Sequence, residues 1–267
     1  RDRSPSRGLG DVYKRQTSAS YAENGASDAS FCSSLTDETP ILAGGRVKPY
    51  FVLANESIKF LTGKSKYKEM PATKVFCSVL MAHRSGSALN IPIKVEHIDT
   101  KEALGLSEDE YFMLSDKLVA NKDLVRSEII KQKENNSYKK DLNKLYNRID
   151  LFEKISSGEA VSIYTGTKQV QLASGRKSLT EFKEISNAEL AKTITVSNKL
   201  YQKDHGDTHL LELTYSKMHL TGYALFLVLI AIFIAVLSNK LKWPIIISFI
   251  VIAVETLAMA MRLSLIH

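Results

Sequence analysis

The chain has 267 residues, 44% of them hydrophobic, and a formal net charge of +7. This length is sufficient for a domain with its own buried core. Residues 1–16 hold five basic and two acidic side chains, so the rest of the chain carries only +4. Because this charge is small and no Lys/Arg cluster is interleaved with aromatic residues, we exclude nucleic acid as a partner.

Both ends of the chain look foreign to the protein. Asp11–Gln16 is the peptide that the end of a sequencing transposon encodes in one reading frame. Leu263–His267 is the peptide that the opposite strand of the same element encodes. We therefore expect residues 1–16 and 263–267 to be adapter-derived, and the fold prediction covers residues 17–262. On this interpretation the native protein continues beyond Arg262.

The chain contains two cysteines, Cys32 and Cys77. Their spacing matches neither CxxC nor CxxCH, which excludes a zinc knuckle and a covalent haem attachment site. Two alternatives stay open. The pair forms a disulfide in an oxidising compartment, or Cys77 is an unpaired core residue, which its apolar helical surroundings favour.

The first elements follow a lead-in over residues 17–40 that is rich in Ser, Ala and Asp and is expected to be flexible. Gly44-Gly45 predicts a turn. Pro49 at a first helical position and Gly63 at a C′ position predict a helix between them. Its apolar residues recur at helical spacing: Phe51, Ala54, Ile58 and Leu61.

The middle of the chain predicts further helices and one strand. Residues 91–96 alternate in polarity and predict a strand, and Ser107–Glu110 matches a capping box that predicts a helix start. A helix after Pro71 is expected to turn four residues inward: Val75, Phe76, Val79 and Leu80. A longer helix ends before Ser157 and carries a heptad-like apolar series: Leu142, Leu145, Ile149 and Phe152. Its expected partner helix holds Leu124, Ile129 and Ile130.

A hairpin and two more helices complete the predicted domain, which spans residues 41–217. Val161–Tyr164 and Val170–Leu172 predict the hairpin. Ser178–Glu181 and Ser186–Glu189 are capping boxes that predict helix starts. The domain is therefore expected to be mainly α with minor β.

Two apolar segments follow the domain. Residues 220–237 contain no charged side chain, and residues 244–261 contain one, Glu255. At about 1.5 Å per residue, each would form a helix roughly 27 Å long, close to the thickness of a bilayer's hydrocarbon core. The predicted fold class is therefore a helical domain followed by a transmembrane helical hairpin over residues 218–262, and the family resemblance described below implies that the domain is extracytoplasmic.

Several segments together resemble a known family. Gly45-Arg-Val-Lys-Pro49, followed by Ala54-Asn-Glu56, resembles the "GR(I/V)KP" opening of the extracytoplasmic domain in fused cytochrome c biogenesis proteins of the CcsA/CcsB type (ResB/ResC, system II). The family-motif residues are Gly45, Arg46, Lys48 and Pro49. Other segments agree in the same order: Pro71–Phe76, Ile91–Val95, Leu104–Leu106, and Tyr111 with Leu114–Asp116.

The resemblance implies a membrane cytochrome c synthetase that delivers haem and supports its covalent attachment to apocytochrome c. It also implies a multi-pass protein of the bacterial inner membrane, with the domain in the periplasm. Expected partners are apocytochrome c, haem, the lipid bilayer and thiol-reducing proteins. The tryptophan-rich "WWD" loop and the haem-ligand histidines of the family cannot be matched. We therefore expect a fragment of a haem lyase without most of its active centre, which holds no haem by itself.

Few residues are candidates for the site, and none is assigned a catalytic or metal-binding role. His219 and Glu255 are candidate cofactor-binding residues, with an interfacial histidine and a structural hydrogen bond as the alternatives. Arg46 and Lys48 could bind haem propionates or an acidic partner, or form a solvated turn. His205 and His209 lie four residues apart around Gly206, which favours a loop over a metal-binding helix.

One rival function belongs to another class. The chain would then be a membrane-anchored, non-catalytic sensor or adaptor whose extracytoplasmic domain binds another protein.

Overall fold

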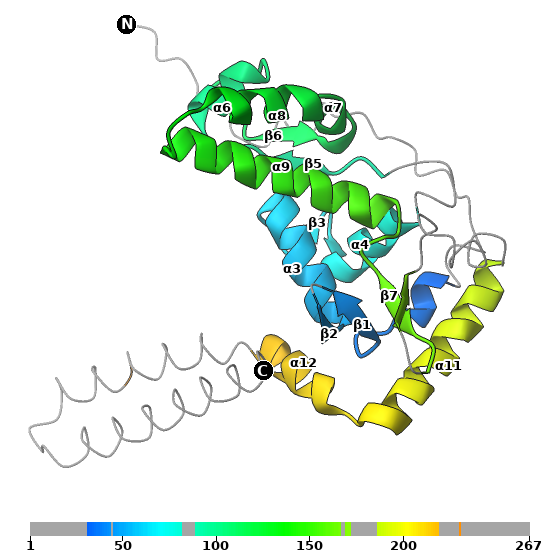
Figure 1. The fold of residues 1–267 in the computed structure, drawn as a ribbon. Helices are drawn as coiled ribbons and strands as arrows, with labels where there is room; N and C mark the ends of the chain where they lie inside the picture. Colours follow the sequence, from blue (N-terminus) through cyan, green and yellow to red (C-terminus); the bar gives the residue numbers. More distant parts are fainter. Residues whose placement is uncertain are drawn as a thin grey trace, which may run out of the picture.

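The computed structural model describes residues 31–43, 45–81, 89–166, 169–171 and 186–218, together with Ile230. Helices predominate in this part of the chain (Figure 1). The helices are α3 (Tyr50–Thr62), α4 (Ala72–Leu80), α6 (Ile98–Ala103), α7 (Ser115–Ala120), α8 (Lys122–Lys131), α9 (Ser137–Ser156), α11 (Asn187–His205) and α12 (Thr208–Met218). The strands are β1 (Pro40–Ala43), β2 (Arg46–Pro49), β3 (Lys66–Tyr67), β4 (Met70–Pro71), β5 (Pro92–Lys94), β6 (Phe112–Leu114), β7 (Ser162–Tyr164) and β8 (Gln169–Gln171).

Three helices, α3, α4 and α9, enclose the core of the domain. α3 packs against α4, and both contact α9, which lies alongside them in Figure 1. The predicted inward faces of α4 and α9 are confirmed by the burial of their apolar side chains: Val75, Phe76, Val79, Leu80, Leu142, Leu145, Ile149 and Phe152. Since burying one such side chain stabilises the fold by about 1.5–3 kcal/mol, these faces are a main source of its stability.

The predicted helix between Pro49 and Gly63 is α3, and the stop signal at Gly63 is confirmed, whereas Pro49 is the N-cap residue and Tyr50 takes the predicted first helical position. Gly63 takes the left-handed conformation that terminates a helix, with φ 76°, and its N–H donates to the carbonyl of Lys59. The inward face contains the predicted residues Ala54, Ile58 and Leu61. Phe51 is only half-buried, whereas its neighbours Tyr50, Val52 and Leu53 are buried, and Tyr50 packs against Phe76 of α4.

A four-stranded antiparallel sheet, with the order β2-β1-β7-β8, contacts α3. β1 and β2 form a hairpin in which Ala43 lies opposite Arg46. Gly45 has φ +81° at its turn, a conformation that residues with a Cβ rarely adopt. β7 and β8 form the predicted second hairpin, and Leu42 opposite Ser162 joins the two hairpins.

The segment before β1 is packed onto the domain. Phe31 and Leu35 are buried, and Cys32 forms a disulfide with Cys77 of α4, with the two Cα atoms 5.9 Å apart. The structure therefore contains the disulfide alternative, although Cys77 also lies in the apolar core. Residues 31–40, which the composition assigned to a flexible lead-in, contribute to this core.

One local prediction was wrong. Ser107 donates both its N–H and its hydroxyl to Glu110, but the chain then continues into β6 instead of a helix. Pairing of β6 with the correctly predicted strand β5 overrides the local capping signal. α8, which contains Leu124, Ile129 and Ile130, is confirmed as the partner of α9, although its buried residue is Val125 and Ile130 is 74% exposed.

The last two described helices bring the chain back to the sheet. The predicted capping box at Ser186 and Glu189 is confirmed and begins α11, which contacts β7. Gly206 ends α11, and α12 then packs against β2 and α3. Figure 1 shows α12 beside this corner of the domain.

The predicted fold class must be corrected. A mainly helical fold with minor β-structure is present, but no helix among the described residues is both long and apolar enough to cross a membrane. α9 and α11 are long but carry charged residues along their length, and the 11 residues of α12 span only about 16 Å. The transmembrane hairpin is therefore removed from the fold class. Its predicted segments, 220–237 and 244–261, lie outside the described residues except for Ile230.

Candidate functional site

The family-motif residues form the turn and edge strand that lead into α3. Gly45 makes the turn, Arg46 and Lys48 lie on β2, and Pro49 is the N-cap residue of α3. The fixed φ of proline suits this position, and the next residue is anchored because the Tyr50 N–H donates to the Thr39 carbonyl at 2.8 Å. The segment thus fixes the direction in which α3 leaves the sheet.

Both basic side chains of this segment are engaged in ion pairs within the chain. Arg46 donates to both carboxylate oxygens of Glu212 in α12, at 2.8 and 3.3 Å. Burial raises the pKa of Glu212, and the Arg46 charge opposes that shift. Lys48 Nζ lies 2.6 Å from Glu56 Oε2 on α3. Arg46 and Lys48 thus each have an acidic partner within the chain.

A groove lies directly beside this segment, between the β1–β2 hairpin, α3 and the end of α9. Its volume of about 660 Å³ is within the usual range for ligand sites. Its apolar lining consists of Leu42, Ala43, Leu53, Phe60, Leu151 and Ala160. Its charged lining consists of Lys48, Glu56, Lys154 and Glu159. We call this surface the motif groove.

The chemistry of the motif groove is that of a binding surface. None of the described residues lining it is a histidine or a cysteine, so they offer haem iron none of its common nitrogen or sulfur ligands. Apolar side chains beside paired charges instead suit a ligand that has both apolar and polar groups.

The two histidines near the end of the domain lie elsewhere. His205 ends α11 and is exposed, whereas His209 lies in the first turn of α12 and is 8% exposed. The Nε2 atom of His209 lies 3.0 Å from the Glu38 carbonyl oxygen, and burial lowers the pKa of its imidazole. The Tyr201 ring stacks against both imidazoles, which therefore belong to a packed aromatic cluster on helix ends, not to the expected loop.

The candidate cofactor residues His219 and Glu255 lie outside the described residues, as do residues 1–16 and 263–267. Within the described ranges, no group of three or more His, Cys, Asp or Glu side chains is placed to hold a metal ion.

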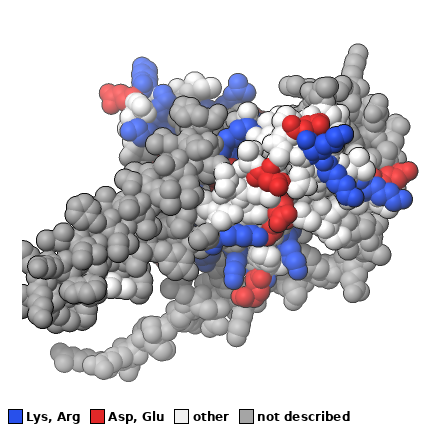
Figure 2. Space-filling view, turned by 90° about the horizontal axis from the view of Figure 1, so that it is seen from below, with Lys and Arg blue, Asp and Glu red and all other residues white. Residues whose placement is uncertain are grey.

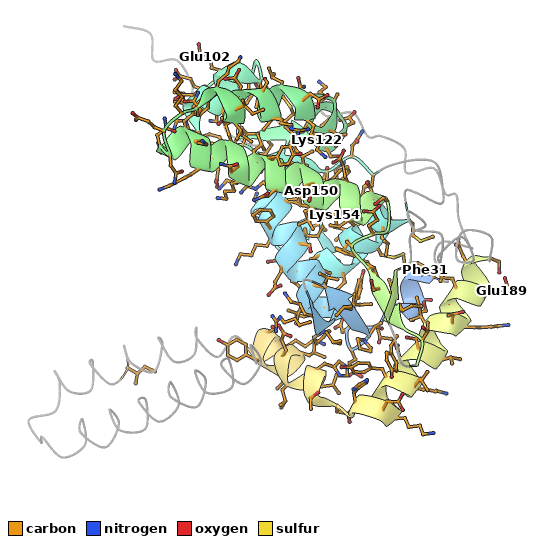
Figure 3. All side chains as sticks on the ribbon, viewed as in Figure 1. Phe31, Glu102, Lys122, Asp150, Lys154 and Glu189 are labelled. Atoms are coloured by element: carbon orange, nitrogen blue, oxygen red, sulfur yellow. A yellow bond between two sulfur atoms is a disulfide. The ribbon has the colours of Figure 1, made fainter. Side chains whose placement is uncertain are left out.

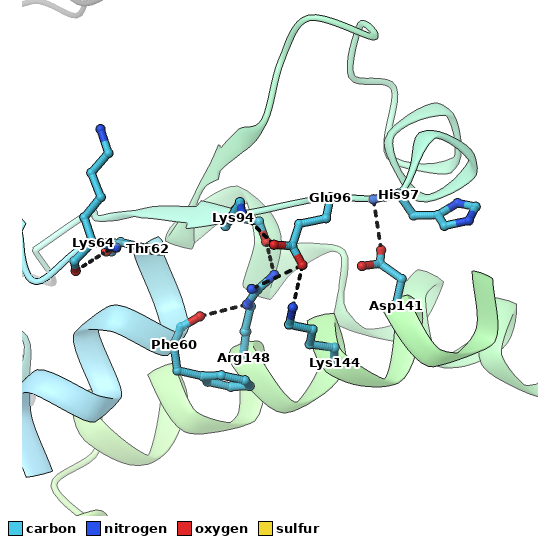
Figure 4. Close-up of polar contacts among 9 residues, drawn as sticks. All are labelled: Phe60, Thr62, Lys64, Lys94, Glu96, His97, Asp141, Lys144 and Arg148. Carbon is cyan, nitrogen blue, oxygen red and sulfur yellow. Dashed lines mark hydrogen bonds and ion pairs between the residues drawn. The ribbon is translucent and has the colours of Figure 1, made fainter. Parts of the chain in front are cut away.

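A second, smaller hollow of about 340 Å³ lies where α9 meets the segment after β5. It is lined by Glu96, His97, Ser137, Lys140, Asp141 and Lys144. Its central carboxylate is already satisfied, because Glu96 lies 2.5 Å from Lys144 Nζ and 2.6 Å from Lys94 Nζ (Figure 4). These two lysines lower the pKa of Glu96 to about 2. We therefore assign this network to the structure of the domain.

One face of the domain carries charges of both signs. Figure 2 shows Lys and Arg side chains interspersed with Asp and Glu on the face seen from below, with no continuous patch of one sign over its described part. The described part of this face therefore shows no single-sign patch of the kind that attracts nucleic acid or an anionic membrane.

The comparisons with known proteins identify no family. No protein-family model matches the chain, and no curated protein is significantly similar to it. The link to cytochrome c biogenesis therefore rests on the ordered sequence segments alone.

Sequence reasoning missed two residues that define this region. Glu212 is an acidic residue within the apolar run Leu210–Leu213, a signal that indicates a buried partner but does not identify Arg46. Glu159 lies in a short polar loop after α9, where the sequence has no signal that places it at a groove.

Proposed function

We propose that this chain is the extracytoplasmic part of a cytochrome c biogenesis protein, and that it binds apocytochrome c while haem is attached. The observation that carries the proposal is the motif groove. The one segment that most closely resembles the family, Gly45–Pro49, borders a surface with apolar and charged lining. An unfolded polypeptide offers apolar side chains next to polar backbone groups, which is the chemistry that such a surface binds.

The disulfide supports the extracytoplasmic half of this proposal. Disulfides such as Cys32–Cys77 persist in oxidising compartments and are rare in the cytosol. The inner-membrane location and the other partners, namely haem, the lipid bilayer and thiol-reducing proteins, stay predictions.

In this proposal the motif groove binds polypeptide and does not ligate haem, since its described lining supplies no imidazole or thiolate. The thioether chemistry would then belong to other parts of the machinery. The rival adaptor function also predicts a protein-binding groove, so the identity of the bound polypeptide decides between them.

The test is a binding titration of the purified full chain. One titrant is apocytochrome c with its haem-linking cysteines replaced by serine, so that no reductant attacks Cys32–Cys77. The other is the haem-bound cytochrome, in which the segment that carries these cysteines is folded and buried. We expect micromolar binding of the apo form and binding of the holo form at least about tenfold weaker, followed by fluorescence anisotropy.

A matched pair of variants locates the binding surface. Leu151→Ser removes an apolar side chain from the groove lining, whereas Ile130→Ser makes the same type of change on the exposed face of α8. Only the first should weaken binding. Equal affinity for the apo and holo forms would favour the adaptor, and binding of neither would contradict the proposal. Stoichiometric uptake of haem with a histidine-ligated Soret spectrum would contradict the assignment of polypeptide binding to this chain and of haem ligation to other parts of the machinery.

A further inference from the structure

The charges that line the motif groove are paired, with one exception. Lys48 is engaged by Glu56 at 2.6 Å. Lys154 is engaged by Asp150, one turn earlier on α9, at 2.7 Å. Figure 3 shows Asp150 and Lys154 together on this part of the helix. Both lysines of the lining therefore already have an acidic partner within the chain.

Glu159 is the exception. Its side chain is exposed in the loop after α9, and it forms neither an ion pair nor a hydrogen bond with the residues that the structure describes. The backbone on either side is fixed, because the Gly158 N–H donates to Ile155 and the Ala160 N–H donates to Lys154, both at 2.9 Å. The loop thus holds one uncompensated carboxylate at the groove.

We propose that the motif groove recognises a polypeptide segment in which a Lys or Arg side chain lies next to an apolar one. Glu159 pairs with the basic group, and the wall around Leu53 and Leu151 takes the apolar side chain. This inference rests on the proposed polypeptide-binding function and specifies the client. An acidic segment would be repelled by Glu159, and the two lysines of the lining, Lys48 and Lys154, already have acidic partners within the chain.

The expected size of the effect follows from the exposure of Glu159. Ion pairs at an exposed rim change affinity by a few-fold and act mainly on specificity and association rate. The preference should therefore be modest at low salt and should disappear when the pair is screened.

The experiment uses three fluorescent peptides that differ only at the position after a central leucine, which is Lys, Gln or Glu. Anisotropy titrations of the full chain at low salt should show the Lys peptide binding roughly threefold to fivefold tighter than the Gln peptide, and the Glu peptide binding weakest. Glu159→Gln should remove these differences, and Glu159→Lys should invert the order. At about 0.5 M salt the wild-type preference should be lost.

The control is Glu134→Lys, which reverses an exposed charge between α8 and α9, away from the groove lining. It should leave the order of the three peptides unchanged. Equal binding of the three peptides to the wild-type chain, with apocytochrome c still bound, would overturn this inference and leave the proposed function standing. A preference that survives Glu159→Gln would overturn the assignment to Glu159. Loss of binding to every peptide and to apocytochrome c would overturn both.

Discussion

The guanidinium of Arg148 in α9 donates from Nε to the backbone carbonyl of Phe60 in α3, 2.8 Å away and 88 residues earlier in the chain (Figure 4). Phe60 lies in the last turn of α3, where carbonyls have no partner within the helix. A second guanidinium nitrogen donates to the carbonyl of Lys94 in β5 at 2.7 Å. One side chain that is 3% exposed therefore satisfies two backbone acceptors and joins three elements.

Replacing this residue should destabilise the domain strongly. Arg148→Met keeps much of the side-chain volume but leaves two backbone carbonyls without a donor, each at a cost of about 1–3 kcal/mol. We expect the free energy of unfolding to fall by about 3 kcal/mol in urea denaturation. Arg126→Met, on the exposed side of α8, is the control and should stay within about 0.5 kcal/mol of wild type. Identical midpoints for the two variants would contradict the role of Arg148.

The core position of Ile58 gives a second prediction. Its side chain has no exposure, so Ile58→Asp would bury a charge without a partner and should cost about 4 kcal/mol. Ile58→Val, which removes one methylene group, should cost only about 1 kcal/mol. Thermal and urea unfolding of the full chain measure both changes. An Ile58→Asp chain as stable as Ile58→Val would refute the placement of α3 against the core.

A third prediction concerns pH. The hydrogen bonds from Lys144 and Lys94 hold the folded-state pKa of Glu96 at about 2, below its ordinary value of 4.5. Because the folded-state pKa is the lower one, the stabilisation by Glu96 is complete above pH 4.5 and is lost as the pH falls toward 2. Wild type should therefore lose more stability across this interval than Glu96→Gln. The control is Glu108→Gln, at an exposed position, whose free energy of unfolding should change with pH as that of wild type does. The same pH dependence for Glu96→Gln and wild type would disprove the stabilisation by Glu96.

The disulfide gives a fourth prediction. Cys32 and Cys77 are 45 positions apart, and closing a loop of this length stabilises a fold by about 4 kcal/mol in the chain-entropy model. The double variant Cys32→Ser, Cys77→Ser should unfold at a correspondingly lower guanidinium concentration. Dithiothreitol should lower the wild-type midpoint to that of the variant and leave the variant unchanged. Two titratable thiols in the unreduced wild-type chain would show that the bond is absent.

The parts of the fold that could be predicted are those where local signals agree. α4 and α9 each have apolar residues at helical spacing together with a clear beginning or end. The face that this spacing defines is the face that each helix buries in the folded domain. The capping signal at Ser107 failed because pairing between β5 and β6, which depends on residues about 20 positions apart, determines that segment. Local sequence could not reveal the motif groove for the same reason, since its lining joins β1, β2 and α3 to residues of α9 and β7 that lie about 100 positions further along the chain.

The pairing of Arg46 with Glu212 has a consequence for how the domain is made. The two residues are 166 positions apart, so at about 5–20 residues per second the ribosome needs roughly 8–33 s to synthesise the second after the first. During this interval β2 is an edge strand without α12 beside it, and unprotected edges pair readily with the wrong strand. Until α12 has been made, the β2 edge therefore lacks the helix that packs against it in the folded domain.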